Sequence, residues 1–417
     1  MTTKKIPEDL VVEIFSRVPA VSLARLRSIS KGWNVLIKDG RVLAKKHSTN
    51  ASNSSLALML IDYRLYIVRF NLNGIHTNVA PSVKVTGLFS LEDPLSYEEV
   101  DICDIFHCEG LLLCTTKDNR LVVWNPCSGE NRWVQPKNSY KEFDLFAFGY
   151  DNKLSCYKIL RIGGSFHGTI FQTENEIYDF TSNSWRVVVG KTIDWSIIED
   201  DHIVKIVREI DYTRGMYVNG NIVIKGDNTR GMYANGNTYW IAFTPNLEHE
   251  HRYNYLLLSF DFSTEIFGNV PFPGDDDIHA CFPLVLSVTR EGQQLCILLN
   301  GALRANHYYI WIASKSESTG AISWTKFLTV WDDGPIYHFG FRHFRAGGLS
   351  FLADHEKEIL LTCNKNSHDQ YSKNIIHIMG NGKYTELDHH GAKPTHEFPS
   401  PLLFCYVPSL VRIQHCI

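Results

Sequence analysis

Apolar positions near the start of the chain follow the spacing of a short amphipathic helix. Ile6, Leu10 and Ile14 recur every four residues, which places them along one face of that helix. Pro19 disfavours helical backbone in the residue before it, so the helix is predicted to end at or before Val18. The chain is therefore expected to begin with one short helix that has a single apolar face.

Two more apolar stripes of helical spacing follow this proline. They are formed by Leu23, Leu26 and Ile29 and by Trp33, Leu36 and Ile37. Ser22 and Ser30 stand where caps of these two helices are expected, and Gly32 weakens the third helix near its start. Three short helices bury little apolar surface among themselves. Their remaining apolar faces must be covered either by the rest of the chain or by a partner protein.

The pattern changes after Ser48–Ser55, a polar segment rich in serine and asparagine that is predicted to link two domains. From Leu56 onward, apolar strands alternate with polar turns, and several turns carry Asn or Asp before a strand with an aromatic residue. The segment 110–134 is the clearest of these units. The turn markers are Asn71, Asn125, Asp179, Asp261, Ser314 and Asn381.

These markers lie roughly 50 to 80 residues apart, the spacing expected when each unit of about four strands forms one blade of a β-propeller. A single blade cannot cover its own two faces, so blades must stack around a ring. The alternative is a pair of β-sandwiches without a true repeat. The recurring turn residues favour the propeller, and we predict an all-β domain of this kind.

One short sequence occurs twice, as T-R-G-M-Y-V-N-G-N at Thr213–Asn221 and as T-R-G-M-Y-A-N-G-N at Thr229–Asn237. Each copy contains an Asn-Gly pair between apolar residues, which is a strong hairpin signal. We interpret the first copy as an extra hairpin produced by tandem duplication. The simpler hypothesis is a tolerated surface insertion, and the other is that the hairpin extends a target-binding loop.

Composition and charge narrow the functional classes. The 417 residues include 41 basic and 45 acidic side chains, a balance that argues against a dedicated nucleic-acid-binding protein. The 10 cysteines are scattered and form no C-x-x-C pair, so no zinc ribbon or thioredoxin-type motif is expected. No signal peptide or membrane-spanning run is recognisable, and we expect a reduced intracellular protein of the cytoplasm or nucleus.

No pattern of residues indicates catalysis, a metal or a cofactor. The sequence has no P-loop, no G-x-G-x-x-G that opens a helix and no G-x-S-x-G elbow. The histidines of His249–His251 and His389–His390 and the acidic run Asp275–Asp277 are interpreted as solvated loop residues. A propeller enzyme with an incidental helical cap is the alternative, although no residue singles it out.

The N-terminal segment resembles an F-box. The resemblance rests on Pro7, Leu10, Glu13, Ile14, Pro19, Leu23, Arg25, Arg27, Lys31 and Trp33. Ile6 stands where family members usually have leucine, and Ser30 stands where they often have cysteine. In that family the F-box docks on a Skp-type adaptor and so joins a cullin–RING ubiquitin ligase. The resemblance implies a docking face made of Pro7, Leu10, Ile14, Leu26, Trp33 and Leu36, with Leu23 and Ile29 as candidates for the internal core.

The rest of the chain resembles the F-box-associated domain of plant F-box proteins, which is regarded as a kelch-like propeller. The motifs G-L-L-L-C with V-W-N-P-C-S-G-E, F-G-Y-D with Y-K-I-L-R, I-Y-D-F-T-S-N-S-W-R and G-N-T-Y-W-I-A occur in the family's order between Gly110 and Phe272. Only Gly163-Gly164 and Gly347-Gly348 form glycine pairs, so the chain is not a standard kelch array. We expect a multidomain protein, with an all-α F-box of three helices at 1–47, a linker at 48–55 and a β-propeller-like domain at 56–417.

These resemblances imply a non-catalytic substrate-recognition subunit of a Skp–cullin–F-box ubiquitin ligase. The F-box is expected to bind the adaptor, and through it cullin and RING proteins, while the β-domain binds a target protein for ubiquitination. No nucleic acid or membrane is expected as a partner. The alternative is an F-box scaffold or decoy whose ligand is not ubiquitinated.

Overall fold

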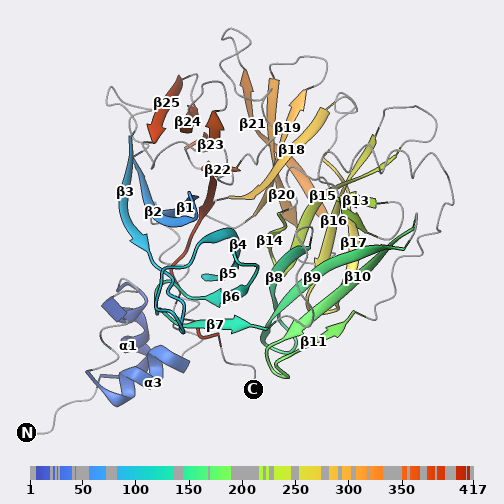
Figure 1. Cartoon of the computed structure of the whole chain (residues 1–417). Helices are drawn as coiled ribbons and strands as arrows, with labels where there is room; N and C mark the ends of the chain where they lie inside the picture. Colours follow the sequence, from blue (N-terminus) through green and yellow to red (C-terminus); the bar gives the residue numbers. More distant parts are fainter. Residues whose placement is uncertain are drawn as a thin grey trace, which may run out of the picture.

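The structure is a computed structural model of the chain (Figure 1). It describes residues 6–18, 22–23, 26, 29–39, 43, 56–71, 82–135, 144–167, 170–188, 216–218, 222–224, 230–245, 253–273, 281–289, 294–301, 307–316, 320–331, 350–354, 357–366, 373–380, 383–389, 401–409 and 411–413. The described part consists of a small helical unit, here called the head, and a large body of β-sheets.

The body is a β-propeller of six blades, each an antiparallel sheet (Figure 1). Blade 1 contains β26 (Leu402–Cys405), β1 (Leu56–Ile61), β2 (Arg64–Asn71) and β3 (Ser82–Phe89). Blade 2 contains β4 (Ile102–Cys108), β5 (Leu111–Thr116), β6 (Leu121–Trp124) and β7 (Asn131–Val134). Blade 3 contains β8 (Leu145–Asp151), β9 (Cys156–His167), β10 (Ile170–Asp179) and β11 (Ser184–Val187). Blade 4 contains β12 (Met216–Val218), β13 (Ile222–Ile224), β14 (Met232–Ala234), β15 (Asn237–Pro245), β16 (Tyr253–Asp261) and β17 (Ile266–Val270). Blade 5 contains β18 (Cys281–Val288), β19 (Leu295–Gly301), β20 (His307–Lys315) and β21 (Ile322–Trp331). Blade 6 contains β22 (Ser350–Asp354), β23 (Ile359–Asn366), β24 (Lys373–Gly380) and β25 (Lys383–His389). The propeller prediction is confirmed, and the alternative of two β-sandwiches is wrong.

The ring is closed by the two ends of the body. The first strands of the blades surround the middle of the ring, where strands of neighbouring blades contact one another. Blade 1 takes its innermost strand from the far end of the sequence, because β26 pairs with β1 and places Phe404 opposite Leu58. Closure therefore depends on pairing between the first and last strands of the described chain.

A hydrophobic core lies between every two neighbouring blades. Between blades 3 and 4, for example, Leu160, Trp240 and Phe260 belong to one fully buried cluster. Gly149 faces the same interface because a Cβ at this position would meet the ring of Phe262 at 2.2 Å. A strand whose two faces are both covered by neighbouring blades is apolar along its whole length. The third strand of blade 2, β6, is an example, because all four of its residues are buried. Close packing against Phe262 therefore explains why Gly149 stands in the F-G-Y-D motif.

Five turns of the body share one backbone arrangement. A side-chain oxygen at the start of the turn accepts a hydrogen bond from the backbone N–H two residues later, and the residue four positions later has a positive φ. These turns begin at Asp93, Asn125, Asp151, Asp179 and Asp261. Three of the predicted turn markers are therefore confirmed.

The other markers have different outcomes. Ser314 was predicted in a turn but lies inside β20, and beyond this strand the Gly320 N–H donates to the Ser316 carbonyl. The aromatic and β-branched residues before Ser314 continue the strand past the expected end. Asn71 is the last residue of β2, and Asn381 lies outside the described residues.

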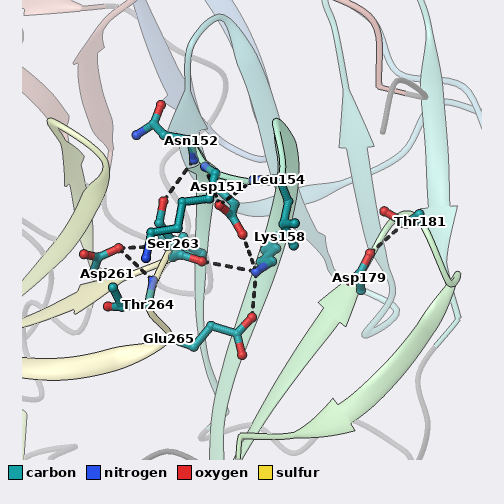
Figure 2. Close-up of polar contacts among 12 residues, drawn as sticks. Asp151, Asn152, Leu154, Lys158, Asp179, Thr181, Asp261, Ser263, Thr264 and Glu265 are labelled. Carbon is teal, nitrogen blue, oxygen red and sulfur yellow. Dashed lines mark hydrogen bonds and ion pairs between the residues drawn. The ribbon is translucent and has the colours of Figure 1, made fainter. Parts of the chain in front are cut away.

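A buried lysine connects blades 3 and 4 (Figure 2). The Lys158 Nζ atom on β9 lies 2.6 Å from a carboxylate oxygen of Asp151 and 2.6 Å from one of Glu265, and it donates to the Phe262 carbonyl at 3.2 Å. Burial alone lowers the pKa of Lys158, but the hydrogen bonds to both carboxylates outweigh it and leave the pKa raised. This charged group therefore ties the first turn of blade 3 to the last turn of blade 4.

One of the two glycine pairs also has a packing reason. A Cβ at Gly163 would meet a carboxylate oxygen of Asp144 at 2.8 Å. That carboxylate is itself buried and lies 2.8 Å from the Arg161 guanidinium, which also contacts Glu176 at 2.7 Å. The pair Gly347-Gly348 lies outside the described residues. The described glycines therefore do not establish a kelch-type repeat.

The duplicated sequence forms two hairpins on blade 4. In the second copy Asn235 and Gly236 have φ values of 51° and 86°, as a two-residue type I′ turn requires. In the first copy β12 pairs with β13, and Val223 of β13 pairs with Phe243 of β15. The first copy therefore adds a hairpin to the sheet of blade 4, which has six strands.

The head contains two helices among the described residues, α1 (Glu8–Phe15) and α3 (Lys31–Asp39), where the sequence predicted three. Most of the segment expected to form the middle helix lies outside the described residues, as does the predicted linker 48–55. Glu8 and Asp9 occupy the first turn of α1, where acidic side chains stabilise the helix. The buried core of the head consists of Val11, Phe15, Leu23, Ile37 and Leu43.

Candidate functional site

A row of apolar side chains at α1 is open to solvent. Ile6, Leu10 and Ile14 are 54%, 55% and 53% exposed, although all three are large aliphatic residues. Val11 and Phe15 point to the other side and are buried in the core of the head. This row, Ile6, Leu10 and Ile14, is called the α1 row below. The helix therefore uses one face for folding and leaves the other uncovered.

The predicted docking residues divide into two groups. Trp33 meets Phe15 edge to face, with ring centroids 5.1 Å apart and ring planes at 86°. Such aromatic contacts hold α3 against α1. The exposed group comprises Pro7, Leu10 and Ile14, and the half-buried group that packs on the head core comprises Leu26, Trp33 and Leu36. Only the first group presents most of its surface to solvent.

The two residues assigned to the internal core have opposite outcomes. Leu23 is fully buried, as predicted, whereas the prediction for Ile29 is wrong because its side chain is 66% exposed. Ile29 lies in a turn before α3, where its N–H donates to the Leu26 carbonyl at 3.1 Å, so the helical spacing ends before it. Sequence reasoning also left the exposed residues Ile6 and Val35 out of the predicted docking set, although their side chains are 54% and 59% exposed. The four-residue spacing of Ile6 from Leu10 could have placed it there, but Val35 carries no comparable signal.

The head contacts the propeller at the turn between β6 and β7 (Figure 1). Cys127 in this turn packs against the core of the head and also against the core between blades 1 and 2. Its Sγ atom lies 3.4 Å from the phenolic oxygen of Tyr406. Burial raises the pKa of the Cys127 thiol above its usual value, so the group is a neutral packing residue. We call residues 125–129 the seat of the head.

The chain beyond β26 runs under the seat. Asn125 is fully buried, and its amide nitrogen donates to the carbonyls of Ser409 at 3.0 Å and Val411 at 2.8 Å. Gly110 has a φ of 85° and lies against Ser409, because a Cβ at position 110 would meet the Ser409 side chain at 2.2 Å. Ile413 is buried in the core between blades 2 and 3. This C-terminal strap, residues 406–409 and 411–413, is therefore a structural part of blade 2.

The seat and the strap identify one face of the ring. Because strands alternate in direction, the turns after the first and third strands of each blade share one face, here called the head face. Gly110 and Cys127 lie on it. Connections between blades and turns after the second strands lie on the opposite, far face. There Arg120, from the β5–β6 turn, contacts Asp93 of the connection between blades 1 and 2 at 2.5 Å.

Comparison with known proteins identifies both parts of the chain. The model of the F-box associated beta propeller domain matches residues 56–207 and 210–413, and the model of the F-box domain matches residues 4–45. The chain belongs to the family of F-box proteins with an F-box associated β-propeller. The match places the α1 row within the F-box and the seat within the propeller.

Curated relatives of this F-box protein cover its whole length. At3g21130 and At3g21120 of Arabidopsis thaliana, both named as F-box proteins, are 45% and 43% identical, over 100% and 99% of this chain and 98% and 100% of their own length. The F-box/kelch-repeat protein At3g44120 of the same organism is 34% identical over 99% of this chain and 97% of its own. These similarities hold for the head and the propeller together.

The described residues form neither a metal site nor a membrane-spanning helix. Within the described ranges of this F-box protein, no group of three or more His, Cys, Asp and Glu side chains is arranged to hold a metal ion. The histidines His249–His251 and the acidic run Asp275–Asp277 lie outside those ranges. None of the described helices has the length and apolar character needed to cross a membrane.

Proposed function

We propose that this F-box protein is the substrate-recognition subunit of a Skp–cullin–F-box ubiquitin ligase. The observation that carries the proposal is the division of the head into a buried side, represented by Phe15, and the open α1 row. Burying apolar surface stabilises a complex by roughly 25 cal/mol per Å². A Skp-type adaptor, the partner that an F-box implies, is the proposed cover for this row.

The proposed docking face contains Ile6, Pro7, Leu10 and Ile14. Interfaces usually depend on a few apolar anchors near their centre. Leu10 lies in the middle of the α1 row and is the proposed anchor. Leu26, Trp33 and Leu36 contribute indirectly in this proposal, because they pack on the core and so maintain the shape of the head.

The proposed mechanism is proximity and requires no catalysis by this chain. The head binds the adaptor, and through it cullin and RING proteins, while the propeller binds a target protein. Holding the target near the charged ubiquitin-conjugating enzyme raises its effective concentration there. Such a mechanism needs a fixed placement of the head, and the contacts of Cys127 with the head core and with Tyr406 support that need.

A titration of the full chain with a purified Skp-type adaptor tests the proposal. Leu10→Asp is expected to weaken binding at least about thirtyfold, equivalent to about 2 kcal/mol. Leu154→Asp is the matched control, because Leu154 is 59% exposed on a propeller turn and receives the same charge. The control is expected to bind within about twofold of wild type. Equal binding by Leu10→Asp, or no binding by a folded wild-type chain, rejects the proposal.

A second measurement separates a ligase subunit from a scaffold or decoy. In a reconstituted complex with cullin, RING protein and ubiquitin-conjugating enzyme, a target bound to the propeller is expected to acquire ubiquitin. Leu10→Asp should abolish this transfer without weakening the contact between propeller and target. A target that binds wild-type complex and stays unmodified supports the scaffold instead.

A further inference from the structure

The connection between blades 1 and 2 forms a well-defined turn on the far face. Its ends are anchored by Leu91 and Val100, which are both buried in the core between these blades. The Val100 N–H donates to the Leu91 carbonyl at 2.8 Å, as in a strand pair. Residues 91–101 are called the far-face turn below. Its two ends are therefore held in place by the propeller.

The tip of the far-face turn is fixed by its own hydrogen bonds. One carboxylate oxygen of Asp93 accepts from the backbone N–H of Leu95 at 2.7 Å and of Ser96 at 3.2 Å. The Tyr97 N–H donates to the Asp93 carbonyl, and the Asp93 N–H donates to the Glu98 carbonyl, both at 2.9 Å. These bonds leave the tip few alternative conformations.

An arginine of blade 2, Arg120, holds the far-face turn through an ion pair. The second carboxylate oxygen of Asp93 lies 2.5 Å from the Arg120 guanidinium. Arg120 is held in turn by Asp118 at 2.6 Å and by the ring of Trp133, whose centroid is 4.2 Å from the guanidinium carbon. Since Asp93 is buried, this ion pair is better protected from solvent than an ordinary surface pair. The turn therefore keeps its shape without a partner.

This rigid tip presents two large apolar side chains to solvent. Leu95 and Tyr97 are 87% and 79% exposed, more than any other large apolar residue in the described part of the chain. Tyr97 also has φ of 58°, a conformation that bulky residues rarely adopt. The other four turns have the smaller or polar residues Gly129, Ser155, Asn183 and Glu265 at this position. Folding gains nothing from an aromatic ring at this site, so the ring needs another explanation.

The charges around the tip define what it can bind. The carboxylates of Asp93 and Asp101 are paired with Arg120 and Arg64, with separations of 2.5 Å and 2.7 Å. Glu92 and Glu98 are exposed, and no ion pair to either one is found among the described residues. The tip is therefore an apolar pair of side chains bordered by uncompensated negative charge.

We infer that the far-face turn is the docking site for the target, with Leu95 and Tyr97 entering an apolar groove on the target protein whose edge carries lysine or arginine. The inference rests on the proposed function. Tyrosine is enriched at protein interfaces, and a tip that is already ordered binds with a smaller entropic cost. Basic residues at the edge of the groove complement Glu92 and Glu98. The site lies on the face opposite the seat, so a target here leaves the head free for an adaptor.

Photo-crosslinking identifies the protein that touches this tip. Full chain in complex with a Skp-type adaptor carries p-benzoylphenylalanine in place of Tyr97 or, as a control, in place of Leu154, and is irradiated in plant cell extract. An adduct formed at position 97 and not at position 154 is identified by mass spectrometry, and the protein is then purified for titration. No adduct at position 97 overturns the inference.

Titration of the purified protein decides between specific docking and chance proximity. Leu95→Arg is expected to weaken its binding at least about tenfold, whereas Leu154→Arg changes it less than about twofold. Glu92→Lys with Glu98→Lys should also weaken it, and added salt should weaken binding to wild type. Unchanged affinity of Leu95→Arg overturns the inference.

A second variant removes doubt about folding. Tyr97→Gly deletes the ring at a position where the positive φ favours glycine, so the variant is expected to melt at or above the wild-type temperature. Its affinity for the crosslinked protein should still fall at least about tenfold. Equal affinity of a folded Tyr97→Gly contradicts the inference.

The two proposals fail in different ways. Leu95→Arg is expected to bind the adaptor like wild type, and Leu10→Asp is expected to bind the target like wild type. A wild-type chain that binds no adaptor rejects the proposed function. If the chain binds the adaptor and substitutions at Leu95 and Tyr97 leave its affinity for the target unchanged, only the proposed docking site is rejected.

Discussion

The thiol of Cys127 lies 3.4 Å from the phenolic oxygen of Tyr406. The same cysteine packs against the core of the F-box head, and the same tyrosine follows directly after β26, the strand that closes the ring. The place where the head sits is therefore built partly from the C-terminal strap. This makes the position of the head depend on a closed propeller.

Removing the amide that holds the strap should destabilise the propeller. Asn125→Ala leaves the carbonyls of Ser409 and Val411 without their buried donor, and we expect a loss of about 2 to 4 kcal/mol in the free energy of unfolding. Urea denaturation followed by tryptophan fluorescence measures it. Asp179→Ala is the control, since this residue begins the corresponding turn of blade 3 and accepts from the Thr181 N–H at 2.7 Å. Similar losses in both variants would mean that the strap contributes little.

Trp33→Ala should weaken adaptor binding by loosening the head. Its ring is half-buried against Phe15, so its removal is expected to cost the head about 2 kcal/mol. Hydrogen exchange of the α1 and α3 amides should then become about thirtyfold faster. Leu10→Asp should leave that exchange unchanged while it weakens adaptor binding at least about thirtyfold. If Trp33→Ala lost binding at normal exchange rates, Trp33 would contact the adaptor directly, as the sequence predicted.

The buried lysine between blades 3 and 4 should be essential for stability. Lys158→Met leaves Asp151 charged and unpaired in a buried site, and the expected cost is about 3 to 5 kcal/mol in the free energy of unfolding. Adding Asp151→Asn should recover part of the loss, because Glu265 keeps Arg186 as a partner. Lys153→Met, at an exposed position of the same turn, is expected to change stability by less than about 0.5 kcal/mol. A calorimetric melt of each variant checks this order of stability, in which Lys158→Met is the least stable and Lys153→Met is close to wild type.

One histidine should make the propeller sensitive to mild acid. His107 accepts a hydrogen bond from the Gly110 N–H at 3.0 Å and lies beside the rings of Phe404 and Tyr406. Burial lowers the pKa of His107 from 6.5 to about 4. Between these values the unfolded chain binds the proton and the folded chain does not. Stability is therefore complete above pH 6.5 and decreases as the pH falls toward 4.

The size of this effect is measurable with a single substitution. The full pKa shift corresponds to about 3 kcal/mol, and because His107 as a whole residue is only half-buried, the expected loss is about 1 to 3 kcal/mol. His107→Gln keeps an acceptor for Gly110 and should remove this part of the pH dependence. The lowered pKa values of Asp151 and Glu265 act only as the pH falls below their usual 3.8 and 4.5, so a change from pH 6.5 to pH 5 tests His107 apart from these carboxylates. An identical slope in wild type and His107→Gln between pH 6.5 and 5 would contradict the assignment.

The fold could be predicted from the sequence largely because its turns are local. Asn125, Asp179 and Asp261 each organise a turn with backbone groups two residues away, so their spacing along the chain reports the blades. The Asn-Gly pair at Asn235 is equally local. By contrast, the contact between Cys127 and Tyr406 joins residues 279 positions apart, and no pattern along the chain signals it.

Exposure of the proposed docking residues was predicted only in part, for a different physical reason. Helical spacing shows that a side is apolar, but it does not show whether that side faces the protein's own core or a partner. Leu10 and Trp33 both carry the pattern, yet Leu10 is exposed and Trp33 packs on Phe15. Which apolar side is covered is decided by how α1 and α3 meet, and that depends on tertiary packing.

The pairing of β26 with β1 also sets the order in which the two parts of the protein become complete during synthesis. The segment that forms the F-box leaves the ribosome first, whereas blade 1 waits for residues 402–405 before it has its innermost strand. A chain interrupted anywhere before Leu402 would carry the F-box segment on an open ring. Translation to the end of the β-body is thus the step that joins the head to a closed propeller.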